Sequence, residues 1–232
     1  MKLLVFDTET TGLIKTCISL DTLDKLPTIV QFSYIIYDTI EKQITETKDY
    51  IIKVPEEVLI PEKSIEYHKI TNEISAKIGV SLNNVLKEFF EHLKYVDLLI
   101  GHNIEFDINM IKIELLRYIN NNTTLPDNVF LYKNDLHYLT NYKNVFCTLK
   151  ETILFCNIKL ISKLGNPYFK FPKLVELHEK MFNTTPTNLH NSFNDILITL
   201  RCFIKFKNNI DLLETCESYK KYTKKIIFSN IL

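Results

Sequence analysis

The 232-residue chain contains no tryptophan, only four glycines, and no excess of charge of either sign. Scarce glycine together with 46% hydrophobic residues favours a globular chain over a disordered one. No apolar run approaches the roughly 20 residues that a membrane-spanning helix needs. The N-terminus opens on a strand pattern instead of a signal peptide. We therefore expect an intracellular protein, in the cytoplasm or the nucleus, with no membrane segment.

Cysteine and charge give weaker indications. The five cysteines are an odd number without a CxxC pair, which predicts reduced, mostly buried thiols. Lysine plus arginine number 28, as do aspartate plus glutamate, so composition alone does not indicate a nucleic-acid binder. If four acids were held around metal ions, the rest of the chain would have 24 acidic and 28 basic residues, an excess of four positive charges. Such a surface would permit phosphate binding without demonstrating it.

Residues 3–13, Leu-Leu-Val-Phe-Asp-Thr-Glu-Thr-Thr-Gly-Leu, carry two acids after an apolar run. Residues i and i+2 of a strand project from the same face, so we expect Asp7 and Glu9 side by side. Two adjacent carboxylates repel each other unless a cation lies between them. The alternative is a polar strand end that caps the following turn. Because open α/β sheets bind ligands where buried strands end, we favour a site for hard metal ions.

Hydrophobic periodicity predicts an α/β chain that begins with an antiparallel three-stranded meander. The expected strands cover residues 2–7, 29–38, 43–54, 97–102 and 145–148. The expected helices cover residues 64–78, 82–93, 106–119, 148 to about 158, a segment opening at Pro172, 191–206 and 209–222.

The segment Asn120–Asn144 interrupts this pattern, since seven of its 25 residues are asparagine and its periodicity is poor. We interpret it either as a long surface insertion or lid, or as a simple loop on a compact core. Because there are no repeats and no linker, residues 1–232 are expected to form one domain. Residues 209–232 form its C-terminal helix and basic tail. The lysines of this tail either follow a nucleic-acid strand or keep the surface solvated.

Two further segments supply acids at the starts of expected helices. His-Asn-Ile-Glu-Phe-Asp at 102–107 places Asp107 in a first helical turn, where the helix dipole favours a carboxylate. Leu-His-Asn-Ser-Phe-Asn-Asp at 189–195 places His190 just before a helix and Asp195 about one turn inside it. The alternatives are an ordinary N-terminal aspartate and a capping or packed histidine. Taken with the first motif, the pattern favours four carboxylates and one histidine around a single pocket.

The chain thus carries, in order, Phe-Asp-Thr-Glu-Thr-Thr-Gly-Leu at 6–13, His-Asn-x-x-Phe-Asp at 102–107 and His-x-x-x-x-Asp at 190–195. Together these motifs resemble the DEDDh (DnaQ-like) family of 3′→5′ exonucleases. This family includes the proofreading exonuclease of bacterial replicative DNA polymerase and the three-prime repair exonucleases. The likeness runs from residue 3 to about residue 206. It implies a ribonuclease H-like α/β fold, with a central mixed five-stranded sheet flanked by helices, in which strands 1–3 are antiparallel and strands 4 and 5 are parallel.

The resemblance also implies chemical roles. Asp7, Glu9, Asp107 and Asp195 would hold two divalent ions, Mg²⁺ or Mn²⁺, and the four together with His190 would form the catalytic set. His190 would accept a proton from the attacking water as a general base. An oxygen-only ligand set argues against zinc. The products would be nucleoside 5′-monophosphates, released one at a time.

Substrate placement follows from the same resemblance. The turn after the first strand would bind the terminal nucleotide, with Leu13 as a wedge against the last bases. Phe106 would line the base pocket and Asn103 would fix the local geometry; plain core packing is the alternative for Leu13 and Phe106. His68 lies in a Tyr-His-Lys-Ile-Thr run that resembles the family's His-Gly-Ile-Thr loop, with Lys69 in place of glycine. The predicted substrate-binding residues are Thr8, Thr10, Thr11, Gly12, Leu13, His68, Asn103 and Phe106.

Three functions stay open at this point. A 3′→5′ exodeoxyribonuclease acting on single-stranded or frayed DNA ends in proofreading, repair or degradation fits the first motif best. A 3′→5′ exoribonuclease that trims RNA would differ in how the terminal 2′-hydroxyl is read. A non-catalytic nucleic-acid-binding module is disfavoured because all four acids and the histidine are present. The expected partners are single-stranded nucleic acid, with DNA favoured, and either a DNA polymerase or a second copy of the chain.

Overall fold

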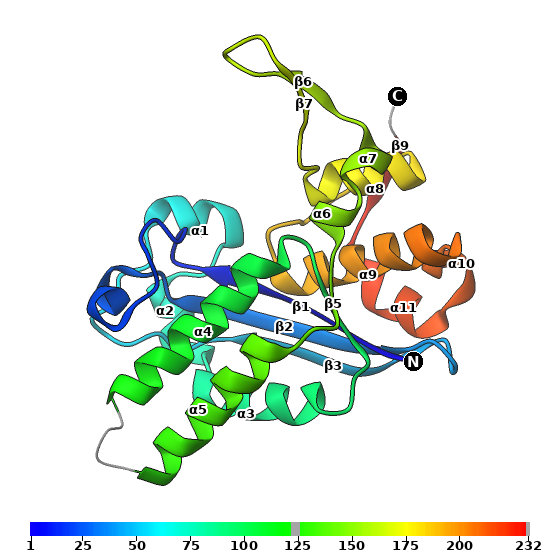
Figure 1. Cartoon of the computed structure of the whole chain (residues 1–232). Helices are drawn as coiled ribbons and strands as arrows, with labels where there is room; N and C mark the ends of the chain where they lie inside the picture. The colour runs from blue at the N-terminus through cyan, green and yellow to red at the C-terminus, as the bar shows by residue number, and fades with distance from the viewer. Residues whose placement is uncertain (122–125, 231–232) are drawn as a thin grey trace.

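A five-stranded mixed sheet forms the centre of the computed structural model, which describes residues 1–121 and 126–230 (Figure 1). The strands lie in the order β3-β2-β1-β4-β5. The first three pair antiparallel, and β4 and β5 add in parallel, so the predicted sheet is confirmed. The strands are β1 (Lys2–Thr10), β2 (Ile29–Asp38), β3 (Gln43–Ile51), β4 (Leu98–Gly101) and β5 (Val145–Cys147).

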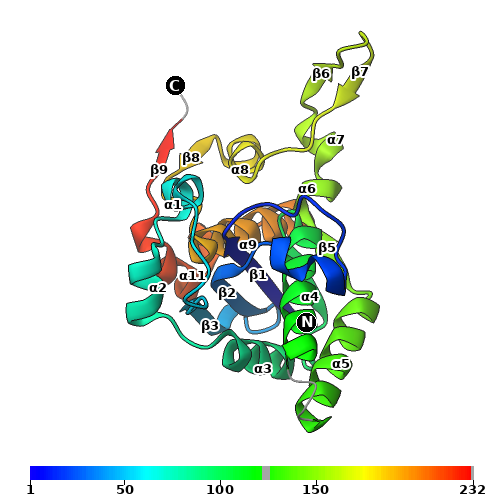
Figure 2. The same cartoon turned by 90° about the vertical axis from the view of Figure 1, so that its left-hand side faces the viewer.

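Helices cover both faces of this sheet (Figures 1 and 2). One face packs against α3 (Leu82–Leu93) and α4 (Ile104–Asn121), and the other against α9 (Ser192–Asn208). The alternation along β1 shows why: Leu4 and Phe6 belong to the first core, whereas Leu3 and Val5 belong to the second. Successive strand side chains point to opposite faces, so a continuous apolar run fills two cores at once.

The segment predicted to be one helix over residues 64–78 forms two. These are α1 (Glu62–His68) and α2 (Asn72–Ile78). Lys69 ends α1 in the left-handed region, at φ 64°, and its N–H donates to the carbonyl of Ile65 at 2.8 Å. A left-handed residue cannot continue a right-handed helix, so the chain turns before α2 begins.

The prediction of an irregular segment over Asn120–Asn144 is wrong for Pro126–Asn141, which forms α5. Residues 122–125 lie outside the described part of the chain. The side chains of Tyr132 and Leu139 are buried in the core that α3 and α4 share. Figure 1 shows α5 alongside α4, and the rings of Tyr118 and Tyr132 stack at 5.1 Å.

The chain after β5 contains small elements that the periodicity did not predict. The expected helix to residue 158 is two short helices that end at Cys156, and the helix over 209–222 is also divided in two. A two-stranded hairpin then stands away from the body in both views (Figures 1 and 2). The helix predicted to open at Pro172 is present as α8 (Leu174–Phe182), and a short η1 (Leu20–Lys25) lies before β2. The small elements after β5 are α6 (Thr148–Glu151), α7 (Ile153–Cys156), β6 (Lys159–Ile161), β7 (Pro167–Phe169), β8 (Thr184–Pro186), α10 (Leu212–Thr215), α11 (Glu217–Tyr222), η2 (Thr223–Lys225) and β9 (Phe228–Asn230), which pairs with β8.

Two further expectations concern thiols and membranes. All five cysteines are free thiols, and four of them are buried, as the prediction of mostly buried, reduced cysteines requires. Within the described residues, no helix has both the length and the apolar character to cross a membrane.

Candidate active site

β1 extends beyond the end of its parallel neighbour, and the first two acids lie on this extension. Pairing between β1 and β4 ends at Val5 opposite Ile100, whereas β1 continues to Thr10. Asp7 and Glu9 continue the Leu3–Val5 alternation, so their side chains face the layer that contains α9. The predicted side-by-side arrangement of these two acids on one strand face is confirmed.

The third acid comes from the first turn of α9. The start of this helix is fixed to β2, because the Ser192 and Ser33 hydroxyls lie 2.6 Å apart and the Asn191 side chain donates to Gln31. Carboxylate oxygens of Asp7, Glu9 and Asp195 lie within 4.8 Å of one another. Residues 188 positions apart in the sequence therefore form one cluster, which we call the acid cluster.

Asp107 lies beside the acid cluster, in the first turn of α4. Its Oδ1 accepts hydrogen bonds from the main-chain N–H of Thr8, at 3.0 Å, and from the Thr8 hydroxyl, at 2.7 Å. Pairing between β1 and β4 has already ended at this point, so the helix start takes the place of a strand partner. Thr8 was expected to contact substrate. Its N–H and its hydroxyl are directed at Asp107, and a contact with substrate stays a prediction.

Burial raises the pKa of all four acids, and repulsion between carboxylates adds to the shift of Asp7, Glu9 and Asp195. Burial is the larger cause for Asp7, whose pKa lies well above its usual value, with Asp107 and Asp195 adding repulsion. Burial followed by the charges of Asp195 and Asp107 raises the pKa of Glu9 to about 8. Burial raises the pKa of Asp107 to about 7 against the two Thr8 hydrogen bonds, and that of Asp195 to about 7 against the His190 N–H. Such a group of acids keeps its full charge at neutral pH only with cations nearby.

The residues fit a hard divalent cation. Every donor is a carboxylate oxygen, which is the ligand type that Mg²⁺ and Mn²⁺ prefer. The Oδ1 atom of Asp195 is buried and has no hydrogen-bond partner. A buried carboxylate oxygen without a partner is costly, and a bound cation would remove that cost.

His190 lies at the rim of the acid cluster. Its main-chain N–H donates to Oδ2 of Asp195 at 3.3 Å, and its backbone is left-handed at φ 65°. His190 is exposed, and its imidazole ring makes a T-shaped contact with the Tyr67 ring, with the ring centroids 5.2 Å apart. The structure therefore brings His190 to the acids, as the third motif predicted. Sequence reasoning missed Tyr67, although it adjoins the loop residue His68.

The turn that follows β1 is held by hydrogen bonds from three elements. The Thr11 N–H donates to the Thr28 carbonyl, and the Thr28 N–H donates to the Thr11 hydroxyl, both at 2.9 Å. The Ser64 hydroxyl from α1 donates to the Thr11 carbonyl, and the Thr10 hydroxyl donates to the Gly12 carbonyl. A Cβ atom on Gly12 would meet nothing within 4 Å, and Leu13 is 70% exposed. The outer side of this turn is open to a ligand.

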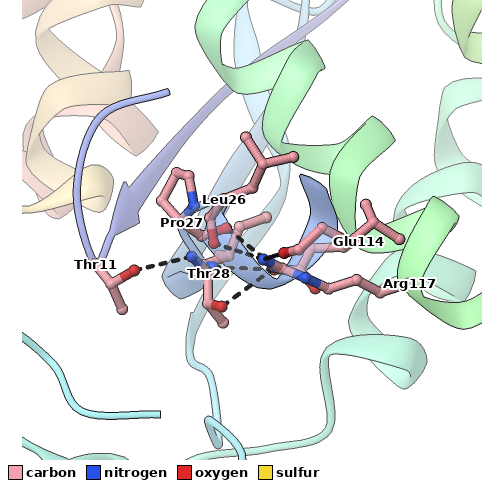
Figure 3. Close-up of polar contacts among 8 residues, drawn as sticks. Thr11, Leu26, Pro27, Thr28, Glu114 and Arg117 are labelled. Atoms are coloured by element: carbon pink, nitrogen blue, oxygen red, sulfur yellow. Dashed lines mark hydrogen bonds and ion pairs between the residues drawn. The ribbon is translucent and has the colours of Figure 1, made fainter. Parts of the chain in front are cut away.

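A partly buried arginine supports the same turn from behind (Figure 3). Arg117 of α4 pairs with Glu114 at 2.8 Å and donates to the Thr28 hydroxyl and to the Pro27 carbonyl. It also donates to the carbonyls of Leu23 and Leu26 in and after η1. Apart from Glu114, these partners lie in residues 23–28, the segment whose Thr28 holds Thr11, so Arg117 fixes the position of the turn without facing the acid cluster.

The remaining predicted substrate residues have mixed surroundings. His68 is buried, and its Nδ1 accepts from the Ile70 N–H at 3.1 Å. Burial lowers the pKa of His68, while the Thr10 main chain opposes the shift. Asn103 is exposed at φ 67°, and its carbonyl accepts from Phe106 N–H, whose ring packs on the first core. Their contacts with substrate stay predictions.

Comparison with known proteins bears on this arrangement. The family model described as exonuclease matches residues 4–203. The chain belongs to the exonuclease family. The resemblance that the three motifs carry is thereby confirmed at the level of the family, and the acids of the cluster lie inside the matched region. No curated protein matches the sequence.

Solved structures of exonuclease I share the fold. Exonuclease I from Methylocaldum szegediense is 16% identical with a TM-score of 0.61, and the match covers 90% of this chain and 41% of that one. Escherichia coli exonuclease I in complex with a dA16 oligonucleotide is 17% identical with a TM-score of 0.59, again covering 90% and 41%. The same enzyme in complex with a dT13 oligonucleotide is 17% identical with a TM-score of 0.59, and the match covers 90% of this chain and 42% of that one. The chain therefore spans about two fifths of the length of these proteins.

Proposed function

We propose that this exonuclease-family chain is a metal-dependent 3′→5′ exodeoxyribonuclease. It removes nucleoside 5′-monophosphates from single-stranded or frayed DNA 3′ ends. The observation that carries the proposal is the acid cluster of Asp7, Glu9 and Asp195 with Asp107 beside it, in a chain of the exonuclease family. DNA is favoured as substrate because structural neighbours of this fold are described in complex with dA16 and dT13 oligonucleotides.

The chain's own residues account for the steps of hydrolysis. Asp7, Glu9, Asp107 and Asp195 would hold the divalent ions. Two such ions, when bound, would neutralise charge on the attacking and leaving oxygens. His190, exposed and anchored through its main chain to Asp195, accepts the proton of the attacking water. The P–O3′ bond breaks, so the phosphate leaves on the released nucleotide and the shortened strand keeps a 3′-hydroxyl.

The turn after β1 positions the strand end. Its main chain is fixed on one side by Thr28 and Ser64, so the free side presents a rigid surface to the last nucleotide. The exposed side chain of Leu13 contacts the terminal bases by apolar stacking. Such contacts are sequence-tolerant, so we expect little preference for one base.

The direct test uses matched 5′-labelled single-stranded DNA and RNA of one sequence, with Mg²⁺ or Mn²⁺. We expect a ladder of shortening DNA products that begins at the 3′ end, and none after chelation of the metal. Asp7→Asn should abolish the ladder while leaving thermal unfolding almost unchanged. Glu41→Gln, an exposed acid at the opposite edge of the sheet, is the matched control and should keep full activity.

Each result bears on one part of the proposal. No ladder on either nucleic acid would contradict an enzymatic function and leave a binding module as the alternative. A ladder on RNA alone would replace the exodeoxyribonuclease with an RNA-trimming enzyme. Products that carry a 3′-phosphate would contradict the bond that we expect to break.

A further inference from the structure

The β6–β7 hairpin is exposed on both faces. Every residue of β6 and β7 is exposed, and the tip residue Leu164 is 88% exposed. A two-stranded hairpin without a covering layer is marginally stable in water, and large exposed apolar patches mark interaction sites. The exposed large hydrophobic residues of this region are Leu154, Phe155, Leu160, Ile161, Leu164, Tyr168, Phe169 and Phe171.

The charge of this region differs from that of the whole chain. Between Glu151 and Glu176 there is no acidic residue, although the complete sequence has as many acids as bases. Lys170 forms an ion pair with Glu176, which joins the base of the hairpin to α8. The three other lysines of the stretch are exposed: Lys159, Lys163 and Lys173.

The register of β6 with β7 shows which of these side chains share a face of the hairpin. Lys159 lies opposite Phe169, and Leu160 lies opposite Tyr168. Directly opposed residues of an antiparallel pair project from the same face, and the Lys159 ammonium lies 6.0 Å from the centre of the Phe169 ring. Each face therefore presents an aromatic ring, and one of them presents a cation beside the ring.

The base of the hairpin is fixed to the edge of the sheet that carries the active site. His102 directly follows β4, and its Nε2 donates to the carbonyl of Pro172 at 3.1 Å. Its Nδ1 lies 2.9 Å from the hydroxyl of Thr148, at the start of α6. Burial lowers the pKa of His102 to about 4, so the ring is neutral and its single N–H is the one that faces Pro172. Both ends of the segment that carries the hairpin therefore meet at His102, five residues before Asp107.

We propose that the β6–β7 hairpin is a second binding surface for single-stranded nucleic acid, which holds the part of the strand upstream of the 3′ end. Aromatic rings stack on bases of any sequence, and lysines neutralise phosphates, so alternating aromatic and basic side chains without acids fit this ligand. An acidic protein partner would match the charge equally well, but the continuity with the active-site edge favours the strand already bound there. The inference rests on the proposed function.

The test compares a short and a long substrate, dT4 and dT30, with the wild-type chain and the variant Tyr168→Ala/Phe169→Ala. For the long substrate we expect KM to rise at least about tenfold, because each stacked base contributes substantially to binding. For the short substrate kcat and KM should stay within twofold, since dT4 offers only three nucleotides upstream of the one that is removed. Tyr95→Ala, which removes an exposed ring near the opposite edge of the sheet, should change neither.

Charge and folding need separate variants. Lys159→Glu/Lys163→Glu should weaken binding of dT30 and reduce its salt dependence, whereas Lys133→Glu on α5 should not. Replacing residues 160–168 with Asn-Gly joins Lys159 to Phe169, which are already paired, through a two-residue turn. This variant should unfold at the wild-type temperature. Its KM for dT30 should rise toward its KM for dT4.

Binding in an inactive background separates this inference from the proposed function. Fluorescence anisotropy of labelled dT30 on Asp7→Asn, with and without the hairpin variants, needs no cleavage. Weaker binding with the hairpin variants supports the inference even if no variant cleaves DNA. If wild-type cleaves both substrates and the hairpin variants keep the same dT30 to dT4 ratio, the inference is wrong and the proposed function stands. If the wild-type chain cleaves neither substrate and neither it nor Asp7→Asn binds dT30, both are wrong.

Discussion

The acid cluster and the β6–β7 hairpin lie near the same edge of the sheet and are built in opposite ways. The acid cluster takes its residues from β1 and α9, with Asp107 of α4 beside it, and these elements are fixed by buried packing or by hydrogen bonds from one another. The hairpin has no covering layer and is held only at its base, through His102 and the Lys170–Glu176 ion pair. Chemistry needs fixed positions, whereas contact with a strand of variable sequence needs exposed surface.

The comparison predicts that changes at the acid cluster affect every substrate. The largest expected effect among the rim residues is that of His190→Ala, which should lower kcat by about 10²–10⁴ at neutral pH because the general base is lost. The assay is single-turnover cleavage of dT4, where the hairpin has no part. His137→Ala, an exposed histidine on α5, is the control. Full activity of His190→Ala at neutral pH would rule out its assignment as the base.

The support behind the turn gives the next largest effect, and it is an effect on stability. Arg117→Met leaves Glu114 buried without its partner, which should cost about 3–5 kcal/mol of unfolding free energy. Urea titration measures this loss. The double variant Glu114→Gln/Arg117→Met should recover part of it, because the unpaired charge is removed. A loss below 1 kcal/mol for Arg117→Met would show that the turn does not depend on this arginine.

The pH dependence of stability tests how far the acids, unlike the exposed hairpin, are affected by burial. Burial, with added repulsion at Glu9 and Asp195, places the pKa of Glu9 near 8 and those of Asp107 and Asp195 near 7, above the ordinary carboxyl value of about 4. Between pH 4 and 8 the unfolded chain therefore binds fewer protons than the folded chain. Stability of the metal-free protein should fall as the pH rises through this range.

Thermal unfolding with a chelator at pH 5, 6, 7 and 8 measures that decline. Added Mg²⁺ should restore more stability at pH 8 than at pH 5, because the ionised acids bind it. A midpoint that does not change with pH would contradict the raised pKa values.

The smallest expected effect concerns Lys69, which was predicted to stand where the family has glycine. Its left-handed backbone is the conformation that glycine adopts without strain, so Lys69→Gly should stabilise the chain by about 0.5–1 kcal/mol. Lys42→Gly, at φ 52° in the turn between β2 and β3, should give a similar gain. Differential scanning calorimetry compares the two. Only Lys69→Gly is expected to alter KM as well, because its loop adjoins Thr10.

The sequence predicted the sheet because β1, β2 and β4 are apolar and β-branched, and β3 follows β2 after a short turn. Ile29–Asp38 was predicted with the same bounds that the structure shows. The acids could be predicted because a strand end or a helix start places each of them locally. Thr8 and its contact with Asp107 could not, since that hydrogen bond joins residues 99 positions apart.

Other parts escaped prediction for physical reasons. The asparagine-rich α5 has a weak apolar stripe, and its helix is set by burial of Tyr132 and Leu139 against neighbouring helices. Strand β8 pairs with β9, more than 40 residues later, and neither shows a long alternating pattern of its own. The hairpin has no buried face, so alternation between polar and apolar residues, the usual signal of a strand, is missing.

The alternation of β1 between two cores has a consequence for motion. Leu3, Leu4, Val5 and Phe6 are fully buried, two in each core, so β1 cannot separate from the sheet without disrupting both. Amide groups in such a strand exchange with solvent only when the whole chain unfolds. The acids at the end of β1 therefore keep their positions through the local openings that loosen loops and chain ends. The hairpin, by contrast, is exposed along both strands and can open without disrupting either core.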